Sequence, residues 1–223
     1  MSDATLESIG FALAVAISTL PIVALIVMQL CRRGSRLGGS FVLGWTLGTA
    51  LLLAIVIAVA DGAGADDPGT TSAWLGIIKI GLGLVLVGVA VKDWTSRPRR
   101  GDPPVLPGWM AALDGYSSMR CLVLGLMLST LNPKNAVLVI GGAVAIASAS
   151  SGLPAELLAA AVFVVLVALP ALVLVLAYAL LSVHQKDRLN RFESALEAKS
   201  MVIMAVILLV IGSLLVANGI AGL

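Results

Sequence analysis

The sequence predicts an all-α, polytopic membrane protein with six transmembrane helices, arranged as a 3+3 inverted repeat in which helices 1 and 4 are broken. Composition is the first observation: 60% of the residues are hydrophobic, 12% are charged, and the mean hydropathy is +1.09. Soluble domains do not have this composition. The second observation is that apolar runs recur along the whole chain, and the third is a polar motif, Asn-Pro-Lys-Asn at 132–135, in the middle of one run.

Each apolar run is long enough to cross a bilayer, which takes roughly 20 residues. The runs cover residues 8–30, 38–60, 73–92, 118–149, 156–183 and 199–221. We therefore expect a single transmembrane domain over 1–223, made of a first three-helix repeat, a Pro-rich cytoplasmic loop and a second three-helix repeat, at 8–92, 93–117 and 118–221. The leader of the first run carries Asp3 and Glu7 instead of basic residues, so we expect it to be retained and not cleaved as a signal peptide.

The basic residues predict the orientation of the helices. All of the 14 Lys and Arg residues except Lys79 and Lys134 lie in or beside the loops after spans 1, 3 and 5. By the positive-inside rule these loops are cytoplasmic, so we expect a multi-pass protein of the cell inner (plasma) membrane with both termini outside. Because the arginines are divided among short loops beside spans, no nucleic-acid partner is expected.

Two lysines lie within spans. Lys134 is near the midpoint of span 4, where an ionised side chain costs about 3 kcal/mol or more. It is therefore the first candidate for binding, the alternative being a structural cation held by backbone carbonyls of the bundle. Lys79 is about two turns from the outer boundary of span 3, so it is either a second binding residue or a side chain that snorkels to the interface.

A short motif recurs in spans 1 and 4. Ser18-Thr19-Leu20-Pro21 corresponds to Ser129-Thr130-Leu131-Asn132-Pro133. Since three spans separate the copies, they run through the membrane in opposite directions, as in an inverted repeat whose discontinuous helices meet near the midplane. The alternative is chance recurrence in an apolar chain, with the hydroxyls bonded back to their own helices.

The two prolines predict where the helices break. Pro21 and Pro133 have no amide hydrogen and clash with the preceding turn, so carbonyls near Ile17 and Ser129 lose their partners. Polar side chains nearby can bond these carbonyls, and whatever stays unpaired can bind a polar headgroup. The predicted substrate-binding residues are Lys134, Asn132, Asn135, Ser18, Thr19, Ser129, Thr130 and Lys79. Pro170 has no polar neighbours and is expected only to kink span 5.

Enzyme signatures are missing from the sequence. His184 is the only histidine, and we find no P-loop, no metal-ligand cluster and no carboxylate pair inside the spans. We therefore expect a protein that is not an enzyme and needs no cofactor, in which a simple carboxylate proton relay is disfavoured. Cys31 and Cys121 lie at the cytoplasmic ends of the suspected repeat helices; without a Cys-x-x-Cys element, two free thiols are favoured over a thiol relay.

These features together resemble the GAP family, the sulfolipid- or glycopeptidolipid-addressing proteins, over essentially the full chain. The residues that carry the resemblance are the first-span Ser18-Thr19-Leu20-Pro21, the loop Arg33-Gly34-Ser35-Arg36 before Gly39 and Gly44, Lys79 with Gly81, and Leu113-Asp114-Gly115 before 128–135. That family is similar to the LysE-type exporters, in which an Asn-Pro-Lys element opens the second half of a six-helix fold.

The resemblance implies export or flipping of a lipid, a glycolipid or an amphiphilic precursor toward the cell envelope of actinobacteria. Lys134 and Lys79 suit an anionic headgroup. Two alternatives stay open: a LysE-type exporter of amino acids or small metabolites, and an accessory scaffold subunit of a larger lipid exporter. The expected partners are membrane lipids, the cargo, such a larger exporter, and a second copy of the chain in a homodimer.

Overall fold

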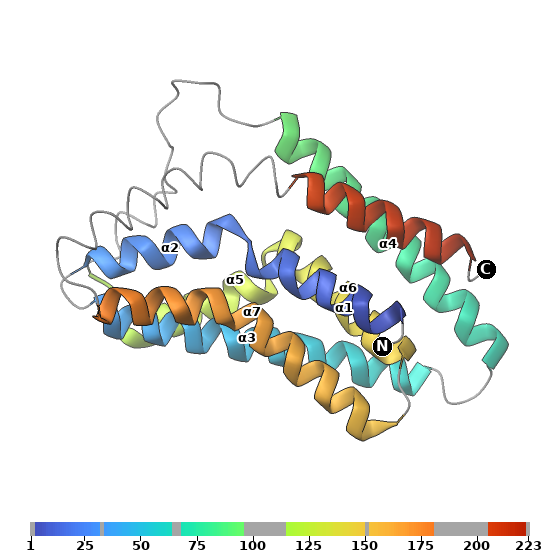
Figure 1. Cartoon of the computed structure of the whole chain (residues 1–223), viewed down its shortest axis with the longest axis horizontal. Coiled ribbons are helices and arrows are strands. Elements are labelled where there is room, and N and C mark those ends of the chain that lie inside the picture. The colour runs from blue at the N-terminus through green and yellow to red at the C-terminus, as the bar shows by residue number, and fades with distance from the viewer. Residues whose placement is uncertain are drawn as a thin grey trace.

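A computed structural model describes residues 3–31, 34–63, 68–95, 115–149, 152–180 and 205–221. Within these ranges the chain is helical apart from short turns, and no strand occurs, so the all-α prediction is confirmed for the part described. The helices, shown in Figure 1, are α1 (Asp3–Ala16), α2 (Thr19–Leu30), α3 (Gly34–Ala63), α4 (Pro68–Thr95), α5 (Ser118–Thr130), α6 (Pro133–Ala149), α7 (Leu153–Leu180) and a C-terminal helix, Ala205–Ala221.

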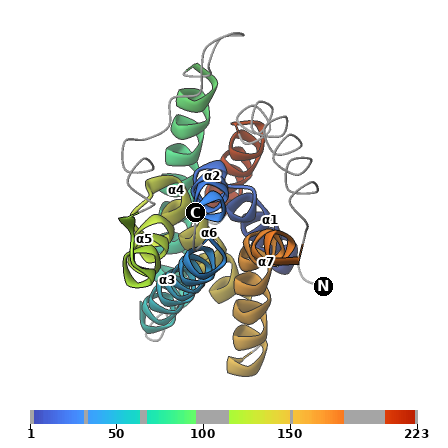
Figure 2. The same ribbon diagram turned by 90° about the vertical axis from the view of Figure 1, so that its left-hand side faces the viewer.

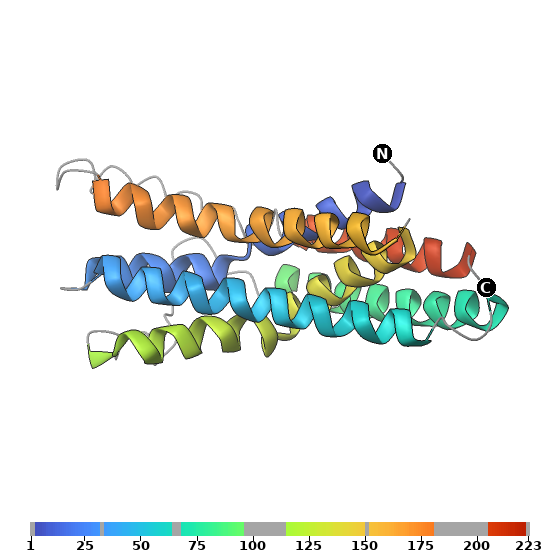
Figure 3. The same ribbon diagram turned by 90° about the horizontal axis from the view of Figure 1, so that it is seen from below.

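The helices lie along one long axis, and two ends of the bundle are distinguished by charge (Figures 1 and 3). The end where α3 and α5 begin carries Arg36 and Arg120, and we call it the basic end. The opposite end, where α3 finishes and α7 begins, carries Asp61 and Glu156, and we call it the acidic end. The two chain termini lie toward the acidic end (Figure 1).

The six predicted spans are supported in part. Two helices, Gly34–Asp61 and Leu153–Leu180, are long and apolar enough to cross a membrane, and the number rises to four if each of two bent helix pairs is one span. Helix α4, which includes Lys79, Lys92 and Asp93, and the shorter Ala205–Ala221 are not among them. The described residues therefore indicate a membrane-embedded helical protein.

Both predicted breaks are present. The axes of α1 and α2 differ by 41°, and those of α5 and α6 by 64°. Pro133 is the first residue of α6 and Pro21 the third residue of α2, so each proline lies in the first turn of a half-helix, where a missing amide hydrogen leaves no intrahelical bond unmade. Pro170 lies inside α7, which is continuous across it, so the prediction that it would not break the helix is confirmed.

Helix α3 is a long helix that contacts several of the others. It packs on α2, α5, α6 and α7, while α1 packs on α6 and α7 (Figure 2). The contact between α3 and α5 is close because Gly44 and Gly125 place no side chain between the two backbones. Another face of α3 carries exposed apolar side chains at four-residue intervals, which is the pattern of a surface in contact with lipid: Leu43, Leu47, Leu51, Ile55 and Val59.

Helix α4 and the C-terminal helix form a closely packed pair, which we call the α4 pair. Gly83 lies against Gly212, and Gly219 lies against the backbone of Gly76. Among α1–α7, α4 packs chiefly on α6. It starts beyond the acidic end of α3 and finishes about midway along the bundle, as Figures 1 and 3 show. This offset brings the last turn of α4 to the break between α5 and α6.

Candidate functional site

The break between α5 and α6 is built by the Asn-Pro-Lys-Asn motif itself. Helix α5 finishes at Thr130, and Leu131 closes it by donating its backbone N–H to the carbonyl of Met127 at 2.7 Å. The side-chain Oδ1 of Asn132 accepts the backbone N–H of Lys134 at 3.2 Å, so Asn132 caps the start of α6. A cap followed by proline at the first helical position is the favoured way to begin a helix.

Asn135 joins the two half-helices. Its side chain is completely buried, and Nδ2 donates to the carbonyl of Leu128 at 3.2 Å. This carbonyl is one residue from the position at which the sequence predicted a lost backbone partner. The other side-chain atom, Oδ1, is buried and has no hydrogen-bond partner among the described residues. Asn135 therefore presents an unpaired acceptor at the break.

The two hydroxyl groups at the end of α5 already donate hydrogen bonds to the backbone of their own helix. Ser129 and Thr130 both donate to the carbonyl of Leu126, at 2.9 and 2.8 Å. Back-bonding of this kind was expected under the alternative to an inverted repeat, and these two hydroxyls of α5 are bonded in this way. The Ser129 side chain is also buried where Gly48 of α3 leaves room for it. These two residues shape the break, but their hydroxyl hydrogens are engaged.

Lys134 forms an ion pair with Asp93, from the last turn of α4, with 2.5 Å between Nζ and Oδ2. The two side chains are 18% and 25% exposed. Asp93 is one residue past the predicted end of span 3, and the position of α4 brings it to Lys134 at the break between α5 and α6. The alternative in which only backbone carbonyls hold Lys134 is replaced by a carboxylate partner.

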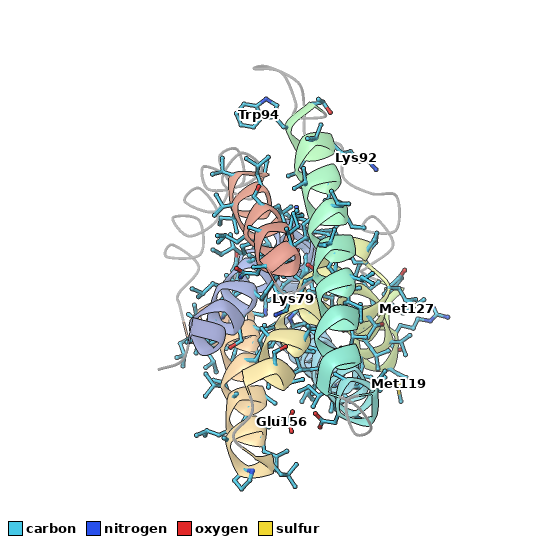
Figure 4. All side chains as sticks on the ribbon, turned by 90° about the vertical axis from the view of Figure 1, so that its right-hand side faces the viewer. Lys79, Lys92, Trp94, Met119, Met127 and Glu156 are labelled. Carbon is cyan, nitrogen blue, oxygen red and sulfur yellow. The ribbon has the colours of Figure 1, made fainter. Side chains whose placement is uncertain are left out.

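Lys79 is not part of this pair. It is half-buried on α4 and precedes Asp93 by 14 residues, which is about 21 Å along a helix at 1.5 Å per residue. Figure 4 shows Lys79 on the side of α4 that faces the bundle, whereas Lys92 points away. The structure thus places Lys79 well away, along α4, from the residue that pairs with Lys134.

The break between α1 and α2 also lies against α3. Ser18 is buried and, with Pro21, lines a cavity of about 10 Å³ against Phe41 and Trp45 of α3. Its hydroxyl does not cap α2. Thr19 is the first residue of α2, and its side chain is outside the described part of the structure. Because Phe41, Trp45 and Gly48 share one face of α3, both breaks meet that helix within two turns.

A larger cavity of about 220 Å³ opens between α1 and α7 near the acidic end, with an almost entirely apolar lining that includes Ser8, Ile9, Val162 and Phe163. Neither this cavity nor the one beside Ser18 includes Lys134. Cys31 and Cys121 are not joined in a disulfide, as expected, and the described residues contain no group of metal ligands.

Comparisons with known proteins identify the family of the chain. A family model described as "SfLAP: Sap, sulfolipid-1-addressing protein" matches residues 9–221, which is nearly the whole chain. No curated protein and no solved structure matches it. The match covers both helix breaks, Asp93 and Lys134. Because it spans nearly the full length and confirms the resemblance to the GAP family, the chain belongs to the SfLAP family of sulfolipid-1-addressing proteins, whose name points to a membrane protein that takes part in lipid addressing.

Proposed function

We propose that this protein is a secondary transporter or flippase that moves an anionic lipid, glycolipid or amphiphilic precursor from the cytoplasmic leaflet toward the cell envelope. The observation that carries the proposal is the Lys134–Asp93 pair at a broken helix. Charged side chains inside membrane helices are costly and mark transport pathways more often than they stabilise a fold.

The chemistry at the break suits a lipid with an anionic, hydroxyl-bearing headgroup. The Lys134 ammonium donates up to three hydrogen bonds to sulfate, phosphate or carboxylate oxygens. The unpaired Oδ1 of Asn135 accepts a hydrogen bond from a sugar hydroxyl. The printed name of the family, which contains a sulfolipid, supports a sulfated headgroup as the first one to test.

The inverted repeat, which we propose as the framework of transport, relates α1 and α2 to α5 and α6, α3 to α7, and α4 to Ala205–Ala221. In such a repeat, the contact between α3 and α5 corresponds to the contact between α7 and α1. The contact between α2 and α3 corresponds in the same way to the contact between α6 and α7, and all four contacts are present. Two helices that are related by a two-fold axis can contact each other when both lie next to that axis. The contact of α3 with α7 and the contact of α4 with the C-terminal helix fit this arrangement.

In this proposal α1 with α2 and α5 with α6 each count as one bent segment. All six segments then cross the inner membrane, and the basic end faces the cytoplasm. A rigid-body motion of one repeat against the other would expose the break to each side in turn. The large apolar cavity between α1 and α7 lies on the outer half and offers space for part of an acyl chain.

The test compares Lys134→Ala with Lys92→Ala, a control in which an exposed lysine of α4 is removed outside the site. Both variants are expressed in a deletion strain, and the lipids and small metabolites of surface and whole-cell extracts are profiled. With Lys134→Ala, we expect a lipid to be missing from the surface extract and to accumulate inside the cells. With wild type or Lys92→Ala, the same lipid should be found at the surface again.

Normal lipid export by Lys134→Ala would contradict the site. Unchanged lipids with an accumulated small metabolite would favour a LysE-type solute exporter. A scaffold subunit would remain active with Lys134→Ala. It would instead lose activity when an open helix face is changed, such as the face of α4 that carries Gly81 and Gly88, where an added Cβ meets nothing within 4 Å.

A further inference from the structure

We propose that Asp93 competes with the cargo for Lys134. In this mechanism, which rests on the proposed function, an anionic headgroup displaces the Asp93 carboxylate from Lys134, and the freed carboxylate takes up one proton from water. Cargo binding and proton binding would then be coupled at a single ion pair. The observation behind the proposal is the direct contact between Nζ of Lys134 and Oδ2 of Asp93.

The pair joins two separate helices. Lys134 is the second residue of α6, held in place by the Asn132 cap and the Asn135 bridge. Asp93 is in the last turn of α4, a helix that packs chiefly on α6 and on the C-terminal helix. The lysine therefore belongs to the firmly packed bundle, whereas the carboxylate belongs to the α4 pair. Separating the charges requires only a displacement of the last turn of α4.

Charge counting explains why a proton follows. The described residues of α6 and of Ala205–Ala221 contain no charged side chain other than Lys134. On α4, Lys92 is exposed and points away from the bundle, and Lys79 lies about 21 Å along the helix. Once Lys134 is bound to an anion, Asp93 has no cation opposite it among the described residues. An unpaired carboxylate among apolar helices is costly, and protonation removes that cost.

The balance of the step is simple. Before binding, the ammonium and the carboxylate sum to zero charge. After binding, the ammonium and a singly charged headgroup sum to zero, and the carboxylate plus one proton gives a neutral carboxylic acid. No oxidant or co-reactant is needed. Because the headgroup and the proton bind and leave together, release of the headgroup is favoured on the side of the membrane with the higher pH.

The experiment uses the full chain, purified and reconstituted in phosphatidylcholine nanodiscs. Sulfogalactosylceramide is the probe, galactosylceramide is the unsulfated control lipid, and inorganic sulfate tests the headgroup chemistry in solution. Affinity and proton uptake, read with an indicator dye in weak buffer, are measured for wild type, Asp93→Asn and a control, Asp61→Asn, which removes an exposed acid at the end of α3.

We expect wild type and Asp61→Asn to take up about one proton per sulfated lipid. Asp93→Asn, which removes the competitor, should bind the sulfated lipid about tenfold more tightly, a difference of 1.4 kcal/mol, with no proton uptake. Wild-type affinity should weaken as pH rises, because protons are bound with the lipid. This last measurement stands even if Asp93→Asn fails to fold.

Two outcomes would overturn the inference. One is sulfated-lipid binding that neither takes up protons nor varies with pH. The other is proton uptake with inorganic sulfate but not with the lipid, which would assign the exchange to a soluble anion. If wild type exports its lipid while either outcome is found, the proposed function survives. If the deletion strain keeps its surface lipids unchanged, the proposed function itself fails.

Discussion

At the scale of single residues, the two asparagines beside Pro133-Lys134 stabilise the break in different ways. Asn132 lies outside the helix and caps the first turn of α6 through Lys134 N. Asn135 lies inside α6 and bonds back to Leu128 of α5. One residue sets where α6 begins, and the other sets how α6 sits on the preceding half-helix. Lys134 is thereby held between two fixed points and presented to Asp93.

The capping role of Asn132 can be tested with a matched pair of substitutions. Asn132→Ala removes the side-chain acceptor for Lys134 N and should lower the free energy of unfolding by about 1 kcal/mol. Asn132→Ser keeps a capping oxygen and should retain most of that stability. The measurement is the thermal unfolding midpoint in detergent. Equal midpoints for the two variants would show that the contact does not stabilise α6.

Sequence reasoning found Lys134 and missed its partner, for a physical reason. A lysine at the centre of an apolar run is conspicuous because nothing nearby on the chain can neutralise it. Asp93 stands beside Lys92 and Trp94 at the edge of a run, where charges are ordinary. Only the position of α4 along the bundle, which depends on packing against α6 and Ala205–Ala221, brings Asp93 to the depth of Lys134.

At the scale of elements, the breaks were predictable because their causes are local. A proline with polar neighbours disrupts a helix wherever the helix packs, and the structure bends both spans there. The relation of the breaks to one another was not predictable in the same way. They meet α3 through Phe41, Trp45 and Gly48, a contact that depends on the tertiary arrangement.

The crossing of α3 and α5 depends on glycine, and a matched pair on α3 tests it. A Cβ at Gly44 would lie 1.9 Å from the carbonyl oxygen of Leu122, a backbone atom that cannot move alone. At Gly39 a Cβ would meet nothing within 4 Å. Gly44→Ala should therefore cost about 1–3 kcal/mol, as overpacking does, whereas Gly39→Ala should be neutral or slightly stabilising.

Chemical denaturation of the two glycine variants, with helix content followed by circular dichroism, measures the difference. Loss of stability in Gly39→Ala but not in Gly44→Ala would contradict the crossing. Because Ser129 lies one turn further along the same contact, opposite Gly48, a distorted crossing should also reduce export by Gly44→Ala.

At the scale of the whole molecule, charge and hydropathy describe the same axis. Arg36 and Arg120 lie at one end of the bundle, Asp61 and Glu156 at the other, and the exposed apolar stripe of α3 runs between them. Composition was enough to predict a helical membrane protein. The number of spans was harder to predict, because α4 combines apolar turns with Lys79, Lys92 and Asp93 and is offset along the bundle.

The orientation of this axis in the membrane gives a prediction for the whole chain. Cys31 and Cys121 are first replaced by Ser and Ala, so that an introduced cysteine is the only thiol. Ser35→Cys and Asp61→Cys then place exposed thiols at the basic and acidic ends of α3. By the positive-inside rule, a membrane-impermeant maleimide should label Asp61→Cys in intact cells and Ser35→Cys only in inverted vesicles.

The reverse pattern would place the basic end outside and make the proposed direction of lipid movement wrong, whereas labelling of both thiols in intact cells would show that α3 does not cross the membrane. Since α3 contacts both helix breaks, its orientation also decides which side of the membrane each half of the site faces.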